Sequence, residues 1–398
     1  MDKVCVVGLG YIGLPTAVLI ASKGYKVTGV DINKDLVKNI NKGITHLNEP
    51  ELDTRLSKVI KNCNLLAQIK PSFSDVFVIA VPTPYIIEKS GICKADTSFL
   101  FDAVKSICPF LKKGNLVIIE STSPVGTTEK IAEFIKIYSK VNLQDLLISY
   151  CPERVLPGKI LKELIQNDRV IGGLNSESSE KTKNFYSTFC KGELHLTNSR
   201  TAEMVKLSEN AFRDINIAFA NEISMVCDRF DINTKTLIKL SNYHPRVNIL
   251  NPGCGVGGHC IAVDPWFIAS EAKDITPLIQ TARKVNKNKT EWVISQIKSK
   301  IKSHKKNSKK IIVGCLGLSF KPNVEDLRES PALQIVENLI DSKFRLLVAE
   351  PNIKNYKNIV IKDYAKVLKE ADLVFILVSH KEFESITIDN KKIFNFSN

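Results

Sequence analysis

The sequence predicts an α/β protein in which two doubly wound parallel-sheet domains are joined by a helical central domain with a long helix. Three observations predict this architecture. A glycine-rich turn separates the first strand from the first helix, strands and helices alternate again late in the chain, and an uninterrupted helical pattern lies between them. We expect the domains at residues 1–198, 199–300 and 301–398.

The glycine-rich turn has the form of a dinucleotide-binding fingerprint. The apolar run Val4–Val7 precedes Gly-Leu-Gly-Tyr-Ile-Gly at 8–13, and helical spacing follows over 14–23. Glycines at these places permit the tight bend, the approach of a pyrophosphate and close helix–strand packing. A second strand over 25–30 ends at Asp31, whose carboxylate can accept hydrogen bonds from ribose hydroxyls and would repel a 2′-phosphate. The pattern predicts NAD, held at this turn by Gly8, Gly10, Tyr11, Ile12, Gly13 and Asp31.

Three further apolar runs predict strands of the same sheet, at Val76–Val81, Leu116–Glu120 and Leu146–Tyr150. Ligands of doubly wound sheets bind at the carboxyl ends of the strands. The loops that follow these runs carry Thr83, Thr122 and the segment 151–154, so we expect those residues near the ligands.

The middle and the last parts of the chain differ in pattern. Residues 201–230 have helical apolar spacing without Gly or Pro, and we expect the chain to remain helical to about residue 300. The polar segment 299–310 is interpreted as a linker. Strands are then expected at Ile311–Leu316, Arg345–Ala349 and Leu373–Val378, which predict a second, smaller Rossmann-like unit.

Composition narrows the classes of partner. The net charge of +14 comes mostly from lysine, and no nucleic-acid-binding motif and no apolar run long enough to cross a membrane is present. The ten cysteines are scattered, without a CxxC pair or metal-ligand spacing. We therefore expect reduced thiols, a cytoplasmic location, no metal, and neither nucleic acid nor membrane as a partner.

One cysteine has an unusual setting. Cys260 follows the glycine-rich run 255–258 and precedes Asp264 by four residues. A thiolate is a strong nucleophile when nearby cations lower its pKa, and small neighbours leave room for a substrate carbon. An inert thiol in a buried turn is the alternative. Together with the dinucleotide fingerprint, the motif favours redox chemistry through a covalent sulfur adduct.

Over nearly its whole length the sequence resembles the nucleotide-sugar 6-dehydrogenase family, also called the UDP-glucose/GDP-mannose dehydrogenase family. The matching motifs are GLGYIGLP, VPTP, ESTSPVGTT, CPERVLPG, KLSENAFRDINIAFANE, GCGVGGHCIAVDP and SFKPNVEDLRESPA. The resemblance implies an NAD-dependent, four-electron oxidation of a sugar C6 hydroxyl to a carboxylate, with polysaccharide biosynthesis as its setting.

Two of these motifs bear on the substrate. The forms PERVLPG and GGHCIAVDPWF are more similar to those of members that act on UDP-N-acetylhexosamines than to those of UDP-glucose dehydrogenases. UDP-N-acetyl-D-mannosamine is the expected substrate, and UDP-N-acetylglucosamine and UDP-glucose remain alternatives. A two-electron hydroxyacid dehydrogenase and a non-catalytic nucleotide-binding protein are the other classes that the sequence leaves open.

The resemblance also implies roles for single residues. Cys260 would capture the C6 aldehyde as a thiohemiacetal that is oxidised to a thioester. Lys206 would act as an acid/base or stabilise an oxyanion, with Asn210 one helical turn later donating to the same oxygen. Asp264 would orient water and Lys206. Thr122 would hold the hydrolytic water and contact the nicotinamide, and Glu153 would act as general base on that water.

The substrate's diphosphate and sugar need cations and hydrogen-bond donors. By resemblance, the substrate-binding residues are Arg154, Val155, Lys206, Asn210, Arg213, His244, Arg246, Gly257 and Lys321. His244 and Arg246 would act from the partner subunit of a homodimer formed through the central helix. Arg328 would meet the NAD side. His259 is not expected to form a dyad with Cys260, because neighbours along an extended loop point apart.

Overall fold

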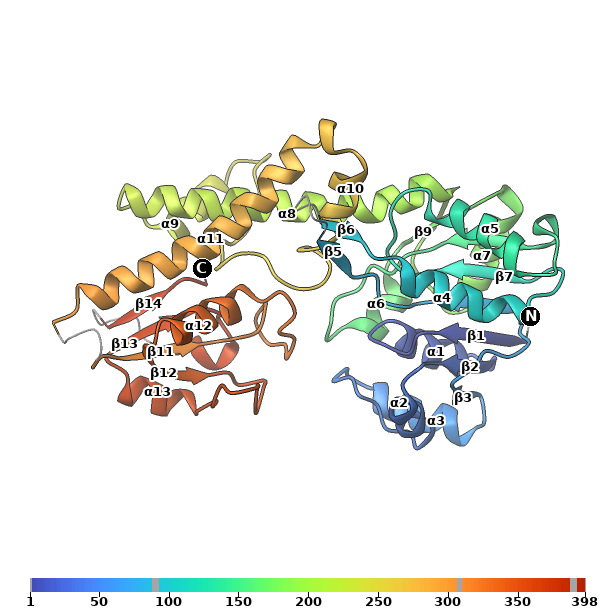
Figure 1. Ribbon diagram of the computed structural model, residues 1–398, viewed down its shortest axis with the longest axis horizontal. Helices are drawn as coiled ribbons and strands as arrows, with labels where there is room; N and C mark the ends of the chain where they lie inside the picture. Colours follow the sequence, from blue (N-terminus) through green and yellow to red (C-terminus); the bar gives the residue numbers. More distant parts are fainter. Residues whose placement is uncertain (1, 88–92, 306–309, 387–391, 398) are drawn as a thin grey trace. The chain divides into compact units, whose positions relative to one another are not determined.

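The computed structural model describes residues 2–87, 93–305, 310–386 and 392–397 (Figure 1). The chain forms two compact units, called here unit 1 (residues 1–209 and 266–271) and unit 2 (residues 210–265 and 272–398). Helices α8 (Ser199–Arg229) and α10 (Asp264–Glu271) each contribute residues to both units.

Unit 1 is built on an eight-stranded sheet in the order β10-β9-β8-β7-β4-β1-β2-β3. Its strands are β1 (Lys3–Val7), β2 (Lys26–Val30), β3 (Leu65–Gln68), β4 (Val76–Ile79), β7 (Leu116–Ile119), β8 (Leu147–Tyr150), β9 (Arg169–Gly173) and β10 (Leu194–Asn198). In this order, the six neighbouring strands β8, β7, β4, β1, β2 and β3 are all parallel. Strand β9 runs antiparallel to β8 and pairs in parallel with β10. The predicted doubly wound α/β sheet is thereby confirmed.

Helices cover both faces of this sheet (Figure 1). Alternate residues of β1 enter different cores, Val4 and Val6 packing on one face and Cys5 and Val7 on the other, as the two-residue period of a strand requires. Side chains of α1, α2, α3, α6 and α7 fill the first core, and those of α4 and α5 the second. The helices are α1 (Gly13–Ser22), α2 (Lys34–Asn41), α3 (Leu52–Lys61), α4 (Ser98–Ile107), α5 (Thr127–Tyr138), α6 (Ile160–Gln166) and α7 (Ser176–Tyr186), and a small hairpin pairs β5 (Tyr85–Ile87) with β6 (Cys93–Ala95).

Helix α5 begins without a capping side chain of its own. Its N-cap residue is Gly126, at φ +84°, and the helix is capped instead by Glu203 from α8. The fully buried Glu203 carboxylate accepts hydrogen bonds from the backbone N–H of Gly126 (2.6 Å) and from Thr128 N (2.8 Å) and Oγ1 (2.6 Å). Burial raises the pKa of Glu203 more than these bonds lower it. The contact fixes the N-terminal part of α8 against the start of α5.

Unit 2 contains a four-stranded parallel sheet in the order β12-β11-β13-β14. Its strands are β11 (Ile312–Leu316), β12 (Arg345–Ala349), β13 (Leu373–Ile376) and β14 (Ile393–Asn395), and its helices are α9 (Thr234–Ser241), α11 (Pro277–Lys302), α12 (Pro331–Asp341) and α13 (Tyr364–Glu370). Helices α11 and α12 share one apolar core with the sheet, and α13 packs in the other. This confirms the second, smaller Rossmann-like unit.

Two expectations for the central region are wrong. Residues 242–263 contain neither helix nor strand, because Pro245, Pro252 and the glycines from 253 to 258 interrupt the helical pattern. The segment 299–310 is not all linker, since α11 continues through Lys302, and residues 306–309 lie outside the described residues. Within the described ranges, no helix is long and apolar enough to cross a membrane.

We predict that Glu203→Ala lowers the free energy of unfolding of unit 1 by about 2–3 kcal/mol, because three donors at the start of α5 would lose a charged acceptor. Chemical denaturation followed by circular dichroism measures the change. Glu180→Ala, at an exposed position of α7, is the control and should change the stability little. An unchanged denaturation midpoint for Glu203→Ala would contradict the capping role.

Candidate active site

The glycine turn after β1 leaves room for a ligand at one position and is tightly packed at the others. A Cβ on Gly8, at φ +92°, would lie 2.6 Å from the backbone O of Ala80, and a Cβ on Gly13 would lie 1.7 Å from Gly8 O. A Cβ on Gly10 would meet nothing within 4 Å. The open space therefore borders the N-terminus of α1, where backbone N–H groups favour an anion, and the half-buried Tyr11 and Ile12 flank it.

Asp31 is held beside this turn at the end of β2. Its Oδ2 accepts a hydrogen bond from the backbone N–H of Leu9 (3.0 Å), and its Oδ1 accepts one from Asn33 N–H (2.9 Å). Each carboxylate oxygen can accept a second hydrogen bond. The arrangement fits the predicted contact with ribose hydroxyls.

The loops after β4 and β7 carry the two predicted threonines. Ser121 Oγ donates to Val81 O (2.7 Å) and ties the loops together. Thr83 Oγ1 is buried and has no hydrogen-bond partner among the described residues, and Thr122 is half-buried one loop away. A buried hydroxyl without a partner is costly, so a bound cofactor that supplied one would stabilise this site. The residues present thus fit NAD.

Lys206 and Glu153 form a buried ion pair in unit 1. The Lys206 side chain, on α8, is 7% exposed, and its Nζ donates to Glu153 Oε1 (3.1 Å) and to Glu153 O (2.7 Å). Glu153 Oε2 also accepts from Val155 N–H (2.9 Å). The pair brings together the predicted acid/base lysine and the predicted general base, so a proton can pass between them.

Arg154, next in the chain, has a partner that the sequence analysis missed. Its guanidinium makes a two-pronged contact with the carboxylate of Glu209 on α8, and its Nη1 donates to Asp168 O (3.2 Å). The Val155 side chain packs against the apolar core under α1. Because Glu209 is 55 positions from Arg154 in sequence, no local pattern indicates the pair.

The loop that carries Cys260 is packed tightly within unit 2. A Cβ on Gly257 would lie 2.5 Å from Glu329 O, and one on Gly258, at φ +81°, would lie 2.9 Å from the ring of Phe320. Gly258 N–H donates to Arg328 O (2.9 Å). Side chains at either glycine would displace the loop and, with it, the thiol.

The surroundings of Cys260 correct one expectation. Cys260 Sγ lies 3.7 Å from His259 Nε2 and 3.9 Å from His259 Nδ1, so the expectation that these neighbours point apart is wrong. The reason is backbone conformation, since residues 259–263 form a turn and not an extended loop. A protonated imidazole at this distance would favour the thiolate.

Asp264 and Asn210 meet in unit 2. Asn210 Nδ2 donates to Asp264 Oδ2 (2.6 Å), and the Asp264 backbone N–H donates to Cys260 O (2.8 Å) at the start of α10. Asp264 is 3% exposed. The turn therefore fixes the Asp264 carboxylate relative to the backbone of Cys260.

A pocket of about 300 Å³ lies in unit 2 beside this loop, and Lys321 lines it together with the segments 251–255 and 377–379. Lys321 Nζ lies 5.7 Å from the ring centroid of Phe320. Arg328 is exposed and donates hydrogen bonds to both carboxylate oxygens of Asp326.

Two buried residues that the sequence analysis missed hold the loop around Lys321. Glu350, after β12, accepts from Leu318 N–H (2.7 Å) and lies 3.0 Å from His380 Nε2, and His380 Nδ1 accepts from Asn323 N–H (3.0 Å). Burial raises the pKa of the Glu350 carboxyl, but the hydrogen bonds outweigh burial and its net pKa is lowered. An acidic residue at the end of a strand, as at Asp31, is the signal that could have found Glu350.

The remaining predicted residues lie on the surface of unit 2. Arg213, His244 and Arg246 are exposed, and His244 Nδ1 accepts a hydrogen bond from Arg246 N–H (3.3 Å). No group of three or more His, Cys, Asp or Glu side chains suited to a metal ion occurs in the part of the chain that the structure describes.

Comparison with protein families gives three matches along the chain. They are the NAD binding domain (residues 2–190), the central domain (200–288) and the UDP binding domain (314–396) of the UDP-glucose/GDP-mannose dehydrogenase family.

Whole-chain comparisons agree with these matches. The chain is 49% identical to the UDP-N-acetyl-D-mannosamine dehydrogenase of Campylobacter jejuni, over 99% of each chain. It is 45% identical to an NDP-N-acetyl-D-galactosaminuronic acid dehydrogenase of Ralstonia nicotianae, over 97% of this chain and 92% of the relative. The solved UDP-D-ManNAc dehydrogenase of Pyrococcus horikoshii superposes with a TM-score of 0.92 at 38% identity, covering 100% of this chain and 95% of the other.

We predict that Asp31→Ser weakens NAD binding and relaxes discrimination against NADP, because it removes both the ribose acceptor and the charge that repels a 2′-phosphate. Equilibrium titration with both cofactors, followed by protein fluorescence, measures the ratio. Asp31→Asn, which keeps one oxygen beside Leu9, is the matched variant and should show a smaller loss of NAD affinity. A wild-type protein that bound NADP as tightly as NAD would refute this role of Asp31.

Proposed function

The chain belongs to the UDP-glucose/GDP-mannose dehydrogenase family, and we propose that it oxidises UDP-N-acetyl-D-mannosamine to UDP-N-acetyl-D-mannosaminuronate. Family membership makes it an NAD-dependent nucleotide-sugar dehydrogenase. The observation that carries the choice of sugar is the 49% identity to a relative named for UDP-N-acetyl-D-mannosamine, over 99% of both chains. The motif around Cys260 and the PERVLPG loop support the same choice.

The proposed reaction proceeds through a covalent bond to Cys260. Gly8, Gly10, Gly13 and Asp31 would hold NAD, and two NAD molecules bound in succession would each supply the acceptor for one hydride. After the first oxidation, the Cys260 thiolate adds to C6 of the aldehyde and gives a thiohemiacetal. The second oxidation converts this adduct into a thioester. Water then cleaves the C–S bond, so the thiol is regenerated and the carboxylate leaves.

Charged and polar groups of each unit have proposed roles in proton transfer and electrostatic stabilisation. Lys206 is proposed to stabilise the oxyanion of each tetrahedral adduct, and its contact with Glu153 (3.1 Å) gives a route for the proton taken from water. Asn210 Nδ2 donates a hydrogen bond to Asp264 Oδ2 (2.6 Å) and so holds this carboxylate in place. Asp264 is proposed to orient the water for hydrolysis. His259, 3.7 Å from Cys260 Sγ, favours the thiolate when it is protonated.

The substrate assignment is tested by measuring kcat/KM for NADH formation with a panel of nucleotide sugars. We expect kcat/KM to be higher for UDP-N-acetyl-D-mannosamine than for any of the other four sugars, which are UDP-N-acetylglucosamine, UDP-N-acetylgalactosamine, UDP-glucose and GDP-mannose. UDP-N-acetylgalactosamine is included because a relative at 45% identity is named for an N-acetylgalactosaminuronic acid. A preference for UDP-glucose would reject the assignment and leave the family unchanged.

The covalent mechanism predicts different losses for different variants. Cys260→Ser should lower turnover by several orders of magnitude and leave NAD and UDP-sugar binding intact, because an alcohol is a poorer nucleophile near neutral pH. Asp264→Asn should accumulate an adduct on Cys260, visible by intact-protein mass spectrometry, if Asp264 serves hydrolysis. Cys63→Ser, at an exposed position, is the control. Near-normal turnover in Cys260→Ser would return the cysteine to a structural role.

The proposed homodimer rests on an exposed apolar stripe along α8. The stripe has a seven-residue spacing from Phe212 to Phe219 and Val226, and Phe230 follows four residues later. These four side chains are 42% to 70% exposed. Residues at this spacing share one face of a helix. Asn216 and Ile223 fall between them on that face. Large exposed apolar faces of this kind pair with a partner, here a second copy of the chain.

We predict that Phe219→Glu converts the protein to monomers at micromolar concentration, because it places a charge in the middle of the apolar stripe. Light scattering coupled to size exclusion measures the mass. Ile137→Glu, at an exposed apolar residue of α5, is the control and should leave the mass unchanged. A wild-type protein that is monomeric under these conditions would remove the dimer, and with it a role for His244 and Arg246 from the partner.

A further inference from the structure

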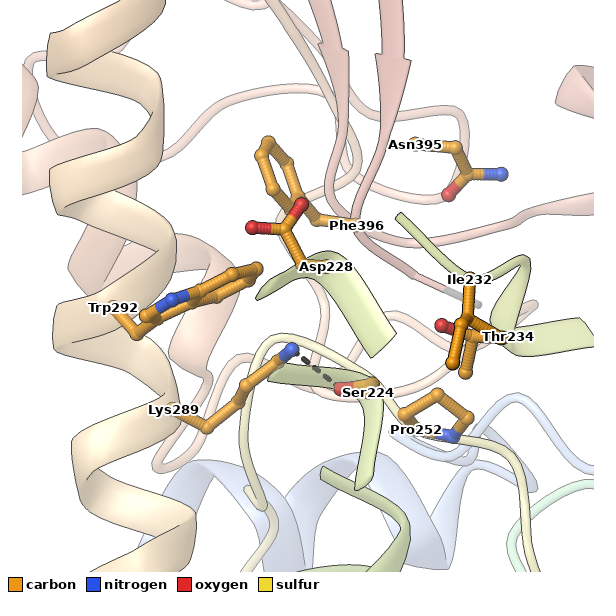
Figure 2. A pocket seen from close by; sticks show the side chains of 9 residues that line it. All are labelled: Ser224, Asp228, Ile232, Thr234, Pro252, Lys289, Trp292, Asn395 and Phe396. Carbon is orange, nitrogen blue, oxygen red and sulfur yellow. Dashed lines mark hydrogen bonds between the residues drawn. The ribbon is translucent and has the colours of Figure 1, made fainter. Parts of the chain in front are cut away.

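Unit 2 contains a second pocket, which none of the residues with a proposed catalytic or substrate role lines. Its volume is about 140 Å³, and it is open to solvent (Figure 2). Ser224 and Asp228 contribute to it from α8, Thr234 from α9, and Lys289 and Trp292 from α11. Phe396, just after β14, completes the wall that Figure 2 shows above Trp292. The pocket is therefore a feature of unit 2 alone.

The central group of this pocket is a buried ammonium. Lys289 is 4% exposed, and its Nζ donates to Ser224 Oγ (2.7 Å), the bond drawn in Figure 2. Ser224 Oγ in turn donates its own proton to Asn221 O (2.6 Å). An ammonium carries three N–H donors. Among the described residues Nζ makes no second hydrogen bond and no carboxylate lies within 4.0 Å of it, so two of its three donors have no acceptor there.

The neighbours of Lys289 compensate its charge only in part. Nζ lies 4.1 Å from the centroid of the Trp292 ring, a cation–π contact. Burial lowers the pKa of Lys289 to about 8, and the partly offsetting influence of Asp228 does not cancel it. A buried cation without a paired carboxylate is unfavourable, and an anionic oxygen placed in the pocket would relieve it.

Asp228 restricts the kind of anion that fits. It lies one helical turn after Ser224, lines the same pocket, and makes no hydrogen bond to Lys289. A carboxylate repels a bare anion but accepts from a hydroxyl. A ligand that satisfies both groups carries an anionic oxygen for Lys289 and a hydroxyl donor for Asp228, with an apolar side against Trp292 and Phe396.

We propose that this pocket is a binding site for a small hydroxylated oxyanion, with its anionic oxygen on Lys289 and its hydroxyl on Asp228. Hydrogen phosphate and small hydroxycarboxylates share this chemistry. The site is separate from the residues proposed for the oxidation, and its existence does not depend on which sugar is oxidised.

The test uses the two tryptophans of the chain as reporters. Trp292 lines the pocket, whereas Trp266 belongs to unit 1. The full-length protein is labelled with ¹⁵N at the indoles, Trp292→Phe assigns the signals, and sodium phosphate or sodium lactate is titrated at constant ionic strength. We expect a saturable shift of the Trp292 indole signal and none of the Trp266 signal. Lys289→Met should weaken the apparent affinity about tenfold or more, and Lys287→Met, exposed on the same helix, should not change it.

Several outcomes would overturn the proposal. One is the absence of a saturable Trp292 shift with both probes, and another is an equal shift in Lys289→Met. The wild-type titration decides the question by itself if Lys289→Met does not fold. Acetate, which lacks the hydroxyl, separates the two contacts. Weaker binding of acetate than of lactate in the wild type, with the difference lost in Asp228→Asn, supports the role of Asp228, and equal binding of the two in the wild type contradicts it.

Discussion

The parallel direction of neighbouring strands is the constraint on which the cofactor site of unit 1 depends. Because β1, β2, β4, β7 and β8 run the same way, their carboxyl ends share one edge, and the fingerprint glycines, Asp31, Thr83, Thr122 and Glu153 all follow these ends. Close packing then selects the residue types. No side chain fits at Gly13, whose Cβ would lie 1.7 Å from Gly8 O, whereas Gly10 faces open space. The buried parallel strands therefore determine where the cofactor site lies, and Gly10 leaves space there for a ligand.

Close packing at glycines also fixes a loop of unit 2, the one that carries Cys260. The Cys260 loop packs by its glycines against Phe320 and the segment after it, so the thiol's position depends on that segment. Glu350 and His380, both fully buried, hold the same segment through backbone N–H groups. The proposed nucleophile and the loop of Lys321 are thereby held by the same buried residues, and a change at His380 would disturb both.

The sequence predicted the parts that depend on local pattern and missed those that depend on distant partners. The strand and helix periods predicted both sheets, the spacing of Gly8, Gly10 and Gly13 predicted the dinucleotide site, and the seven motifs that resemble the family identified it. The Arg154–Glu209 contact joins residues 55 positions apart, and no spacing rule indicates it. His259 was misjudged because a turn replaced an extended loop, and residues 242–263 because proline and glycine ended a helical pattern that was extrapolated across them.

The central claim is that Cys260 carries a sugar carbon through two successive oxidations without releasing the aldehyde. The measurement that tests it most directly is the ratio of NADH to product, with limiting UDP-N-acetyl-D-mannosamine, excess NAD and an aldehyde-trapping amine in solution. The account predicts two NADH for each UDP-N-acetyl-D-mannosaminuronate and no trapped aldehyde. One NADH per sugar, with the aldehyde recovered as the trapped adduct, would contradict it.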